Sequence, residues 1–121
     1  MKVEGLKTLF IDIDGTLLHH HGKANQQTKL PAIVLPGVTE KLSEWDIKGY
    51  RIILVTGRKE SERPDTIKQL AESHIQYDYL IMGISRGDRV IINDMKPNSD
   101  GAPTAVAINV VRNEGIENIE L

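Results

Sequence analysis

The chain has 121 residues, a length typical of one domain with one hydrophobic core. Its 15 Lys and Arg against 17 Asp and Glu give a net charge of −2, so nothing points to nucleic acid or to a membrane surface as partner. The lack of cysteine excludes disulfides, thiolate catalysis and Cys-ligated zinc. No apolar run suits a signal peptide or a membrane helix. We expect one soluble, cytoplasmic domain over residues 1–121.

The first half of the chain predicts strands and helices in alternation. Residues 7–12, "KTLFID", have the apolar character of a buried strand, and Gly15 then permits a sharp turn. Residues 18–36 begin polar and contain Gly and Pro, which predicts a loop or short flap. Residues 37–48 carry apolar side chains at helical spacing, and residues 51–55, "RIILV", form a second apolar strand.

The second half continues the pattern with one more helix and three more strands. Residues 62–74 suit a helix with a proline in its first turn. The strands are expected at 78–82, 89–93 and 104–109. Because the strands are apolar throughout, they indicate an α/β fold with a parallel sheet covered by helices on both faces.

The connection at residues 83–88, "GISRGD", is too short for the helix that normally links parallel strands. Six extended residues still reach about 20 Å, enough for a bare crossover. The alternative is an antiparallel hairpin of 78–82 with 89–93, and we favour the crossover. Arg86 lies in this connection and Arg89 directly after it.

Asp12 and Asp14 form the most informative stretch, "DIDGTL". Residues two apart in a strand share a face, with Cα atoms about 6.6 Å apart. Two carboxylates whose charges approach to 4 Å repel by roughly 4 kcal/mol at an effective dielectric of 20. A cation or a shared proton is therefore expected beside them.

Polar residues also end two other predicted strands, and the carboxyl ends of parallel strands meet at one edge of a sheet. Thr56, Gly57 and Arg58 follow the second strand, and Asp94 follows the fourth. Carboxylates with a hydroxyl are hard oxygen donors that suit Mg²⁺ and a phosphate. The Thr56 hydroxyl and Gly57 N–H would bind phosphoryl oxygens, leaving Arg58, Arg86 or Arg89 to neutralise charge.

These motifs, "DIDGTL", "ILVTGR" and "VIIND", resemble the haloacid dehalogenase (HAD) superfamily of phosphatases in order over residues 7–111. The resemblance implies a Rossmann-like parallel sheet of about five strands in the order 3-2-1-4-5. It also implies Mg²⁺-dependent hydrolysis of a phosphomonoester. Neither usual insertion point holds a cap domain, so the pocket should be open, and the flap at 18–36, a large substrate or a second subunit would cover it.

The resemblance also implies roles for single residues. Asp12 would be the nucleophile that forms an aspartyl-phosphate, and Asp14 would protonate the leaving oxygen and then activate water. Mg²⁺ would bind the side chains of Asp12 and Asp94 and the carbonyl of Asp14. Thr56 matches the hydroxyl that holds the phosphoryl group. The nearest members act on sugar phosphates, so a small phosphorylated substrate is expected.

The chain departs from the family pattern at two positions. Relatives of this type often have "GKP" where this chain has "GIS", so the expected lysine is absent. Arg86 is the first candidate to replace it and Arg89 the second, although a guanidinium is not equivalent to an ammonium. Asn93 stands where an acid often precedes the metal-binding aspartate. A catalytically weak or inactive module that binds phosphate or metal is therefore the alternative function.

Simpler interpretations exist for several of these residues. The acids could form only an Asx turn, Thr56 a helix cap and Asp94 a turn. An EF-hand fits poorly, because Leu17 stands where the calcium loop needs glycine. A response-regulator receiver needs an aspartate after the third strand, where "DYLIM" has none. The run at residues 19–21 is expected to be a solvated loop, with substrate contact as the alternative.

Overall fold

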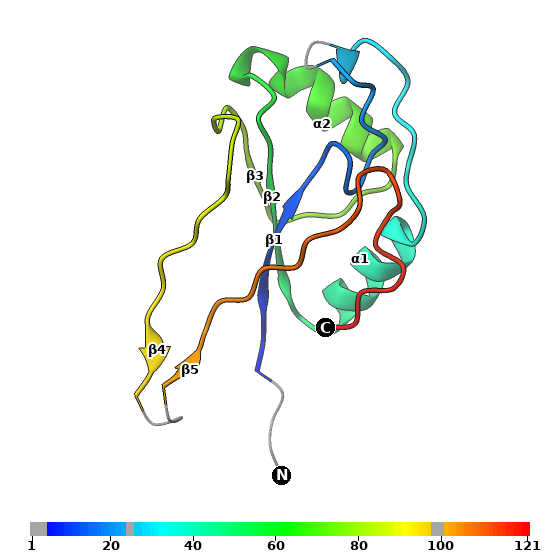
Figure 1. Ribbon diagram of the computed structural model, residues 1–121. Coiled ribbons are helices and arrows are strands. Elements are labelled where there is room, and N and C mark those ends of the chain that lie inside the picture. Colours follow the sequence, from blue (N-terminus) through cyan, green and yellow to red (C-terminus); the bar gives the residue numbers. More distant parts are fainter. Residues whose placement is uncertain (1–4, 24–25, 98–100) are drawn as a thin grey trace.

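The computed structural model describes residues 5–23, 26–97 and 101–121, and its centre is a parallel sheet. The strands β1 (Thr8–Asp12), β2 (Arg51–Val55) and β3 (Tyr79–Ile81) lie in the order β1-β2-β3 (Figure 1). Asp12 pairs with Val55, and Val55 with Ile81, so these residues share the carboxyl edge. The first three predicted strands and their parallel pairing are confirmed.

Two α-helices follow β1 and β2 in the chain, as the sequence predicts. Helix α1 (Val38–Ile47) ends before Gly49, whose φ of 83° is readily adopted by glycine. Helix α2 (Arg63–Glu72) follows a short 3₁₀ helix, η2 (Glu60–Glu62), and has proline in its first turn. The two helices agree with the ranges predicted at 37–48 and 62–74.

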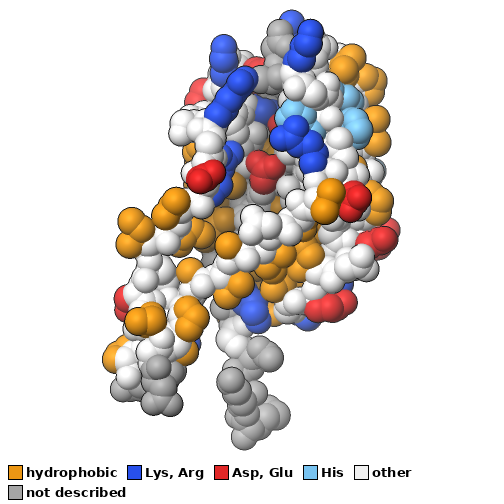
Figure 2. Space-filling view, in the orientation of Figure 1, with side chains coloured by type: hydrophobic (Ala, Val, Ile, Leu, Met, Phe, Trp, Pro, Cys, Tyr) orange, Lys and Arg blue, Asp and Glu red, His pale blue; other side chains and the backbone are white. Residues whose placement is uncertain are grey.

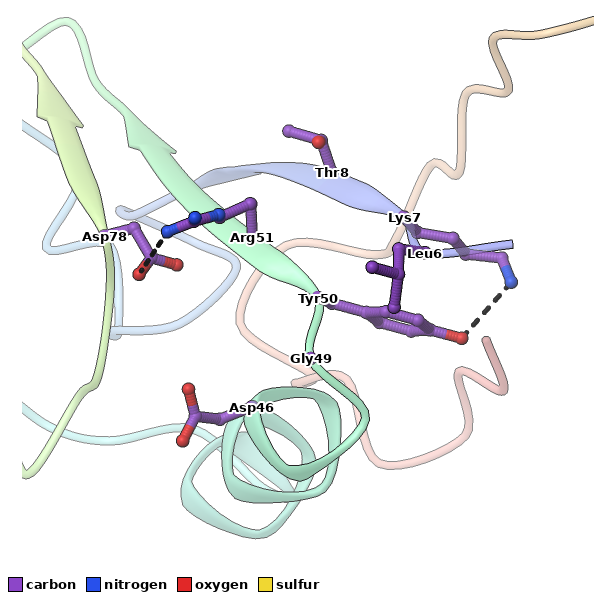
Figure 3. A pocket seen from close by; sticks show the side chains of 8 residues that line it. All are labelled: Leu6, Lys7, Thr8, Asp46, Gly49, Tyr50, Arg51 and Asp78. Atoms are coloured by element: carbon purple, nitrogen blue, oxygen red, sulfur yellow. Dashed lines mark hydrogen bonds and ion pairs between the residues drawn. The ribbon is translucent and has the colours of Figure 1, made fainter. Parts of the chain in front are cut away.

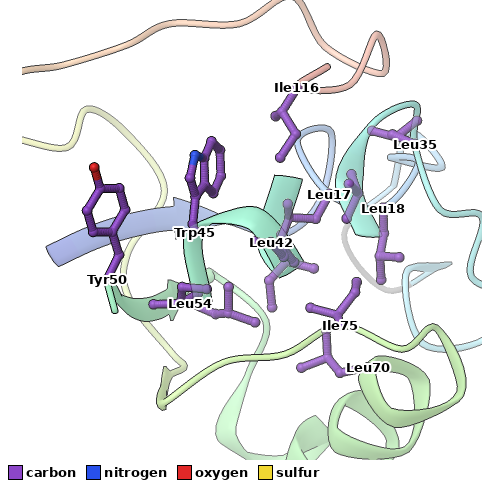
Figure 4. Close-up of a cluster of buried hydrophobic side chains, with 13 residues drawn as sticks. Leu17, Leu18, Leu35, Leu42, Trp45, Tyr50, Leu54, Leu70, Ile75 and Ile116 are labelled. Atoms are coloured by element: carbon purple, nitrogen blue, oxygen red, sulfur yellow. The ribbon is translucent and has the colours of Figure 1, made fainter. Parts of the chain in front are cut away.

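The core lies between these helices and one face of the sheet. Ile52 and Leu54 of β2 are fully buried there and pack with Trp45 and Leu42 of α1 and Leu70 of α2 (Figure 4). Strand side chains on the other face of the sheet are more exposed to solvent. Examples are Phe10, which is 55% exposed, Tyr79 at 58% and Ile81 at 43%. In the described ranges no α-helix covers that face, so the expectation of helices on both faces is wrong for this part of the chain.

The predicted flap is a loop closed at its base. Leu18 forms an isolated antiparallel bridge with Val34, and the N–H of His19 donates to the carbonyl of Ile33 at 2.8 Å. Leu35 donates back to Leu17 at 3.0 Å. Residues 24 and 25 of the flap lie outside the described residues. The loop therefore leaves and re-enters the core at adjacent points.

The chain after β3 differs from the prediction. Residues 89–93 and 104–109 are extended but belong to no strand, and β4 (Met95–Lys96) pairs antiparallel with β5 (Ala102–Pro103) in a separate two-stranded sheet. Figure 1 shows these two segments as the sides of a long arm. The positions expected for the fourth and fifth strands in the order 3-2-1-4-5 are not confirmed.

The short connection explains this difference. Strand β3 ends at the carboxyl edge, and Arg89 is still near enough to Asp12 for its charge to act on that carboxylate. Residues 83–88 therefore do not return the chain to the amino edge, which a parallel fourth strand would require. Neither the crossover nor the hairpin is formed, and Val90, Ile92 and Val106 remain 78%, 94% and 78% exposed.

The C-terminal segment returns to the core beside the start of α1. Ile116 is only 2% exposed, and its N–H donates to the Pro36 carbonyl at 3.1 Å. Gly115 has a φ of 86°, and a Cβ atom there would collide with Pro36. In the part of the chain that the structure describes, no helix combines the length and the hydropathy required to cross a membrane.

Candidate active site

The loop after β1 holds the two acids in a tight turn. The carbonyl of Ile13 accepts hydrogen bonds from the N–H groups of Leu17 and Leu18 at 2.9 and 3.0 Å. Ile13 and both leucines are at most 1% exposed. Gly15 has a φ of 93°, which glycine adopts without strain. Buried leucines and internal hydrogen bonds therefore fix the loop that carries Asp12 and Asp14.

Asp12 is a partly buried carboxylate without an ion pair among the described residues. The Thr16 hydroxyl donates to its Oδ2 at 3.4 Å. Burial raises the pKa of Asp12, and the charge of Asp14 raises it further. The Arg89 guanidinium, the Thr16 hydroxyl and the N–H of Ile13 act in the opposite direction, but the net shift of the pKa is upward.

Asp14 is held by Arg58 in a bidentate ion pair. Nε and Nη2 of Arg58 lie 2.9 and 2.8 Å from the two carboxylate oxygens. The same guanidinium donates to Thr66 at 3.1 Å and to Gln69 at 2.6 Å. The side chains of Arg58 and Asp14 are 3% and 12% exposed. The cation expected beside the acids is thus an arginine, and Arg58, predicted to bind substrate, is occupied in this structure.

Thr56 and Gly57 lie at the carboxyl end of β2, at the same edge. Thr56 is 1% exposed, and its hydroxyl oxygen accepts the N–H of Arg58 at 3.1 Å. Gly57 is exposed, and a Cβ atom there would lie 3.4 Å from the Ile84 carbonyl oxygen. The Thr56 hydroxyl therefore stabilises the turn that positions Arg58. Thr56 also follows Val55, which pairs with Asp12, so it lies at the same edge of the sheet as the acids.

The two remaining predicted residues lie on the segment after β3. Arg86 and Asp94 are both exposed. The backbone carbonyl of Asp94 accepts a hydrogen bond from the Thr104 hydroxyl, and Asp94 directly precedes β4, on the arm that extends away from the end of β1 (Figure 1). Arg89 reaches the site electrostatically, while its guanidinium donates to the carbonyls of Ser85 and Gly87.

The predicted metal ligands are therefore not assembled in this arrangement. Within residues 5–23, 26–97 and 101–121, no group of three or more His, Cys, Asp or Glu side chains is placed to hold a metal ion. Asp12 and Asp14 lie together, but Arg58 already compensates Asp14. These residues as placed do not fit a magnesium ion.

The surface around the acids carries charges of both signs. Figure 2 shows acidic side chains in a hollow, with Lys or Arg side chains on either side and histidines nearby. The cavity in Figure 3, of about 340 Å³, lies elsewhere: Thr8 and Arg51, which begin β1 and β2, line it together with Asp46 and Asp78. It opens at the amino edge of the sheet, opposite Asp12, and is separate from the candidate site.

Two residues near the acids were not singled out from the sequence. The N–H of Asn113 donates to the Gly15 carbonyl at 2.8 Å, and its side-chain oxygen accepts the N–H of His20 at 2.7 Å. A Cβ atom on Gly15 would lie 3.2 Å from Cγ of Arg112. Nothing local in "VRNEG" predicts this contact, because it depends on where the C-terminal segment packs.

Comparisons with known proteins show which chains share this fold. A chain in a structure of the Pnkp1/Rnl/Hen1 complex is 31% identical, with a TM-score of 0.58, over 69% of this chain and 31% of that one. A chain in a structure of the Pnkp1/Rnl/Hen1 RNA repair complex is 34% identical, with a TM-score of 0.55, over 64% and 26%. This chain thus spans a third or less of those chains.

A Vibrio cholerae crystal structure has the same fold, with a TM-score of 0.54 and 20% identity over 82% of this chain and 90% of that one. No curated protein matches the sequence. The model of one protein family, the haloacid dehalogenase-like hydrolases, matches residues 9–97, from β1 through β4. That match includes both acids, the turn after β2 and most of the chain, so this protein belongs to the haloacid dehalogenase-like hydrolase family.

Proposed function

We propose that the protein is a phosphatase that hydrolyses a phosphomonoester with Asp12 as nucleophile. Membership of a hydrolase family supports the reaction class. The observation that carries the proposal is the difference between the two acids: Arg58 binds both oxygens of Asp14, whereas Asp12 receives one long side-chain hydrogen bond, from Thr16. Asp12 is thus the carboxylate with an oxygen available for attack.

The proposed reaction has two steps, and Asp12 is regenerated at the end of the second. In the first, an oxygen of Asp12 attacks phosphorus, the bond between phosphorus and the ester oxygen breaks, and that oxygen takes up a proton. In the second, water attacks phosphorus, inorganic phosphate leaves, and the Asp12 carboxylate is restored. Splitting the hydrolysis in this way makes the intermediate an aspartyl-phosphate.

Asp14 is proposed to move the proton in both steps. Its two oxygens are fixed by Arg58, so the carboxylate keeps one orientation beside the reacting centre. Arg58 uses one acceptor position on each oxygen, so a second position remains where Asp14 can take up a proton. The pair therefore orients Asp14 without blocking proton transfer.

The charge of the phosphoryl group needs a cation, and Arg89 fits this role better than Arg86. The Arg89 charge acts on Asp12, whereas Arg86 makes no contact with the acids among the described residues. The Thr16 hydroxyl and the Gly57 N–H are further donors near the expected oxygens. Arg89 would then take the place of the lysine that the family often has in the motif "GKP", where this chain has "GIS".

The resemblance to HAD phosphatases implies Mg²⁺, which the described residues as placed do not hold. Asp94 would have to approach Asp12 for the predicted ligand set to form. Isothermal titration calorimetry with MgCl₂ at millimolar concentration tests this. Uptake that is lost in Asp94→Asn supports a site shared with the arm, and no uptake by the wild type contradicts it.

The substrate is proposed to be small and phosphorylated, with a sugar phosphate as the first candidate. The open site is compatible with a second copy of the chain covering it. Two of the similar chains belong to complexes that contain Pnkp1, Rnl and Hen1, one of them described as an RNA repair complex. A phosphorylated oligoribonucleotide therefore belongs in the substrate panel.

The experiment is phosphate release from p-nitrophenyl phosphate, a panel of sugar phosphates and that oligonucleotide, with and without Mg²⁺. The control is Asp12→Asn, which removes the nucleophile and keeps the side-chain volume. We expect release by the wild type that exceeds this control. Release at the level of Asp12→Asn on every substrate would instead support the alternative, a module that binds phosphate or metal without turnover.

A further inference from the structure

We propose that Arg112 and His20 form a subsite for a second anionic group of the substrate, on the Asp14 side of the active site. The inference rests on the proposed phosphatase function and adds a substrate class to it: phosphate esters that carry another phosphate or a carboxylate. Neither residue lies in the motifs that suggested the family, and Arg112 lies outside the part of the chain that the family model matches.

Backbone hydrogen bonds fix Arg112 beside the loop that carries the acids. Asn113, the next residue, donates its N–H to Gly15 at 2.8 Å. Its side chain is bonded to the backbone of His20 in both directions, at 2.7 and 3.3 Å. The φ of Asn113 is 65°, which asparagine tolerates better than most residues. Ile116, buried in the core, holds the segment on its other side.

The guanidinium of Arg112 is available to a ligand. Arg51, Arg58 and Arg63 each pair with an acid, and Arg89 donates to backbone carbonyls. In contrast, the side chain of Arg112 makes no ion pair or hydrogen bond within the described ranges, and Arg112 is exposed. A guanidinium that is free, planar and held in place by its backbone can bind a phosphate or carboxylate through two N–H groups.

His20 adds a neutral donor next to it. A Cβ atom on Gly15 would lie 3.7 Å from Cβ of His20 and 3.2 Å from Cγ of Arg112, so both side chains lie against Gly15. Nδ1 of His20 accepts the N–H of Gly22 at 2.9 Å. The neutral ring therefore carries its proton on Nε2, where it can donate. Burial and then the Arg112 charge lower the pKa of His20, which keeps the ring neutral at pH 7.

The two sides of the site carry different cations. Arg89 acts on Asp12, the nucleophile, and so serves the phosphoryl group. Arg112 and His20 lie against Gly15, next to Asp14, which exchanges a proton with the leaving oxygen. A substrate with its reacting phosphate on Asp12 would direct its other end toward Arg112. An anion at that end would then gain a charge-assisted hydrogen bond that a neutral leaving group cannot make.

The test compares two substrates that differ by one phosphate, fructose 1,6-bisphosphate and fructose 6-phosphate, with p-nitrophenyl phosphate as a reference. We expect the wild type to prefer the bisphosphate in kcat/KM, and Arg112→Gln to reduce that preference by about tenfold or more. Arg112→Lys should restore part of it. Hydrolysis of p-nitrophenyl phosphate should be unchanged. Arg51→Gln, an exposed arginine at the other edge, is the matched control.

Three results would overturn the inference while leaving the phosphatase proposal intact. They are turnover without preference for the bisphosphate, a preference that Arg112→Gln does not alter, and an equal loss on all three substrates. The last would place Arg112 on the transferred phosphoryl group. If no substrate is turned over above Asp12→Asn, the phosphatase proposal fails, and calorimetry on Asp12→Asn still decides the subsite. The subsite would then be refuted if Asp12→Asn binds the two sugar phosphates with equal affinity, or if adding Arg112→Gln leaves both affinities unchanged.

Discussion

Arg58 is the residue whose replacement most directly tests the structure of the site. It is the only residue shown to pair with Asp14 in the described ranges, and it also donates to Thr66 and Gln69. Arg58→Met keeps an unbranched side chain as far as the position of Nε but removes the charge and all four side-chain hydrogen bonds. The change leaves a carboxylate that is only 12% exposed without its cation.

The expected loss of stability is large because the partner charge stays buried. Removing one member of a buried ion pair costs about 3–5 kcal/mol. The total free energy of unfolding of a typical domain is about 5–15 kcal/mol. The corresponding fall in Tm is about 10–20 °C. By contrast, Arg51 lies 3.7 Å from Asp78 with its side chain 67% exposed, so Arg51→Met should cost less than about 1 kcal/mol.

Urea unfolding at pH 7 measures both variants, with the fluorescence of the single, buried Trp45 as the probe. A double-mutant cycle with Asp14→Asn isolates the pair. We expect the double variant to lose about 2 kcal/mol less than the sum of the single losses, because neither charge is then left alone. Additivity within about 0.5 kcal/mol, or equal losses in Arg58→Met and Arg51→Met, would refute the reasoning.

Three further predictions concern Asp12, the arginines near it and the C-terminal segment. Asp12→Asn should raise the free energy of unfolding at pH 7 by about 0.5–2 kcal/mol. Since the pKa of Asp12 is raised in the fold, the wild type should lose stability relative to this variant as the pH rises from 3.8, in urea titrations at several pH values; a constant difference would contradict this. Arg89→Gln should raise that pKa further and move the acid limb of kcat/KM to higher pH, while Arg86→Gln should not; equal shifts would favour Arg86. Gly115→Ala should destabilise by more than about 1 kcal/mol in thermal unfolding, because of its positive φ and the contact with Pro36, and an unchanged Tm would show that the segment does not pack there.

The sequence was sufficient to predict the first part of the fold because each element there has a local cause. The apolar runs before Asp12 and before Thr56 each form a parallel strand, and both helices have their expected bounds within two residues. The close placement of the two acids also follows from their spacing and the glycine after them. These predictions depended on periodicity and turn chemistry, which a single sequence carries.

The rest of the site depended on which segments meet, and this is where the predictions differ from the structure. Arg58 was predicted to face the substrate, but its burial against Thr66 and Gln69 is set by the packing of α2 on the turn after β2. The apolar run before Asp94 was predicted to be a strand. Its composition fits one, but the preceding connection does not carry the chain back to the amino edge. Propensity could not reveal either outcome.

The arrangement of cations explains why Asp12 and Asp14 can differ in role although they are two residues apart. Arg58 is buried within the fold and pairs with Asp14, so that carboxylate is compensated before any ligand binds. Arg89 and Arg112 lie on the two segments that flank the β4–β5 arm and keep their charges near the surface. A reacting phosphate would meet the charge of Arg89, and a second anionic group of the substrate would meet that of Arg112, without disturbing the Asp14 pair. Binding energy from these two contacts would therefore offset the repulsion between the reacting phosphate and the ionised, partly buried Asp12.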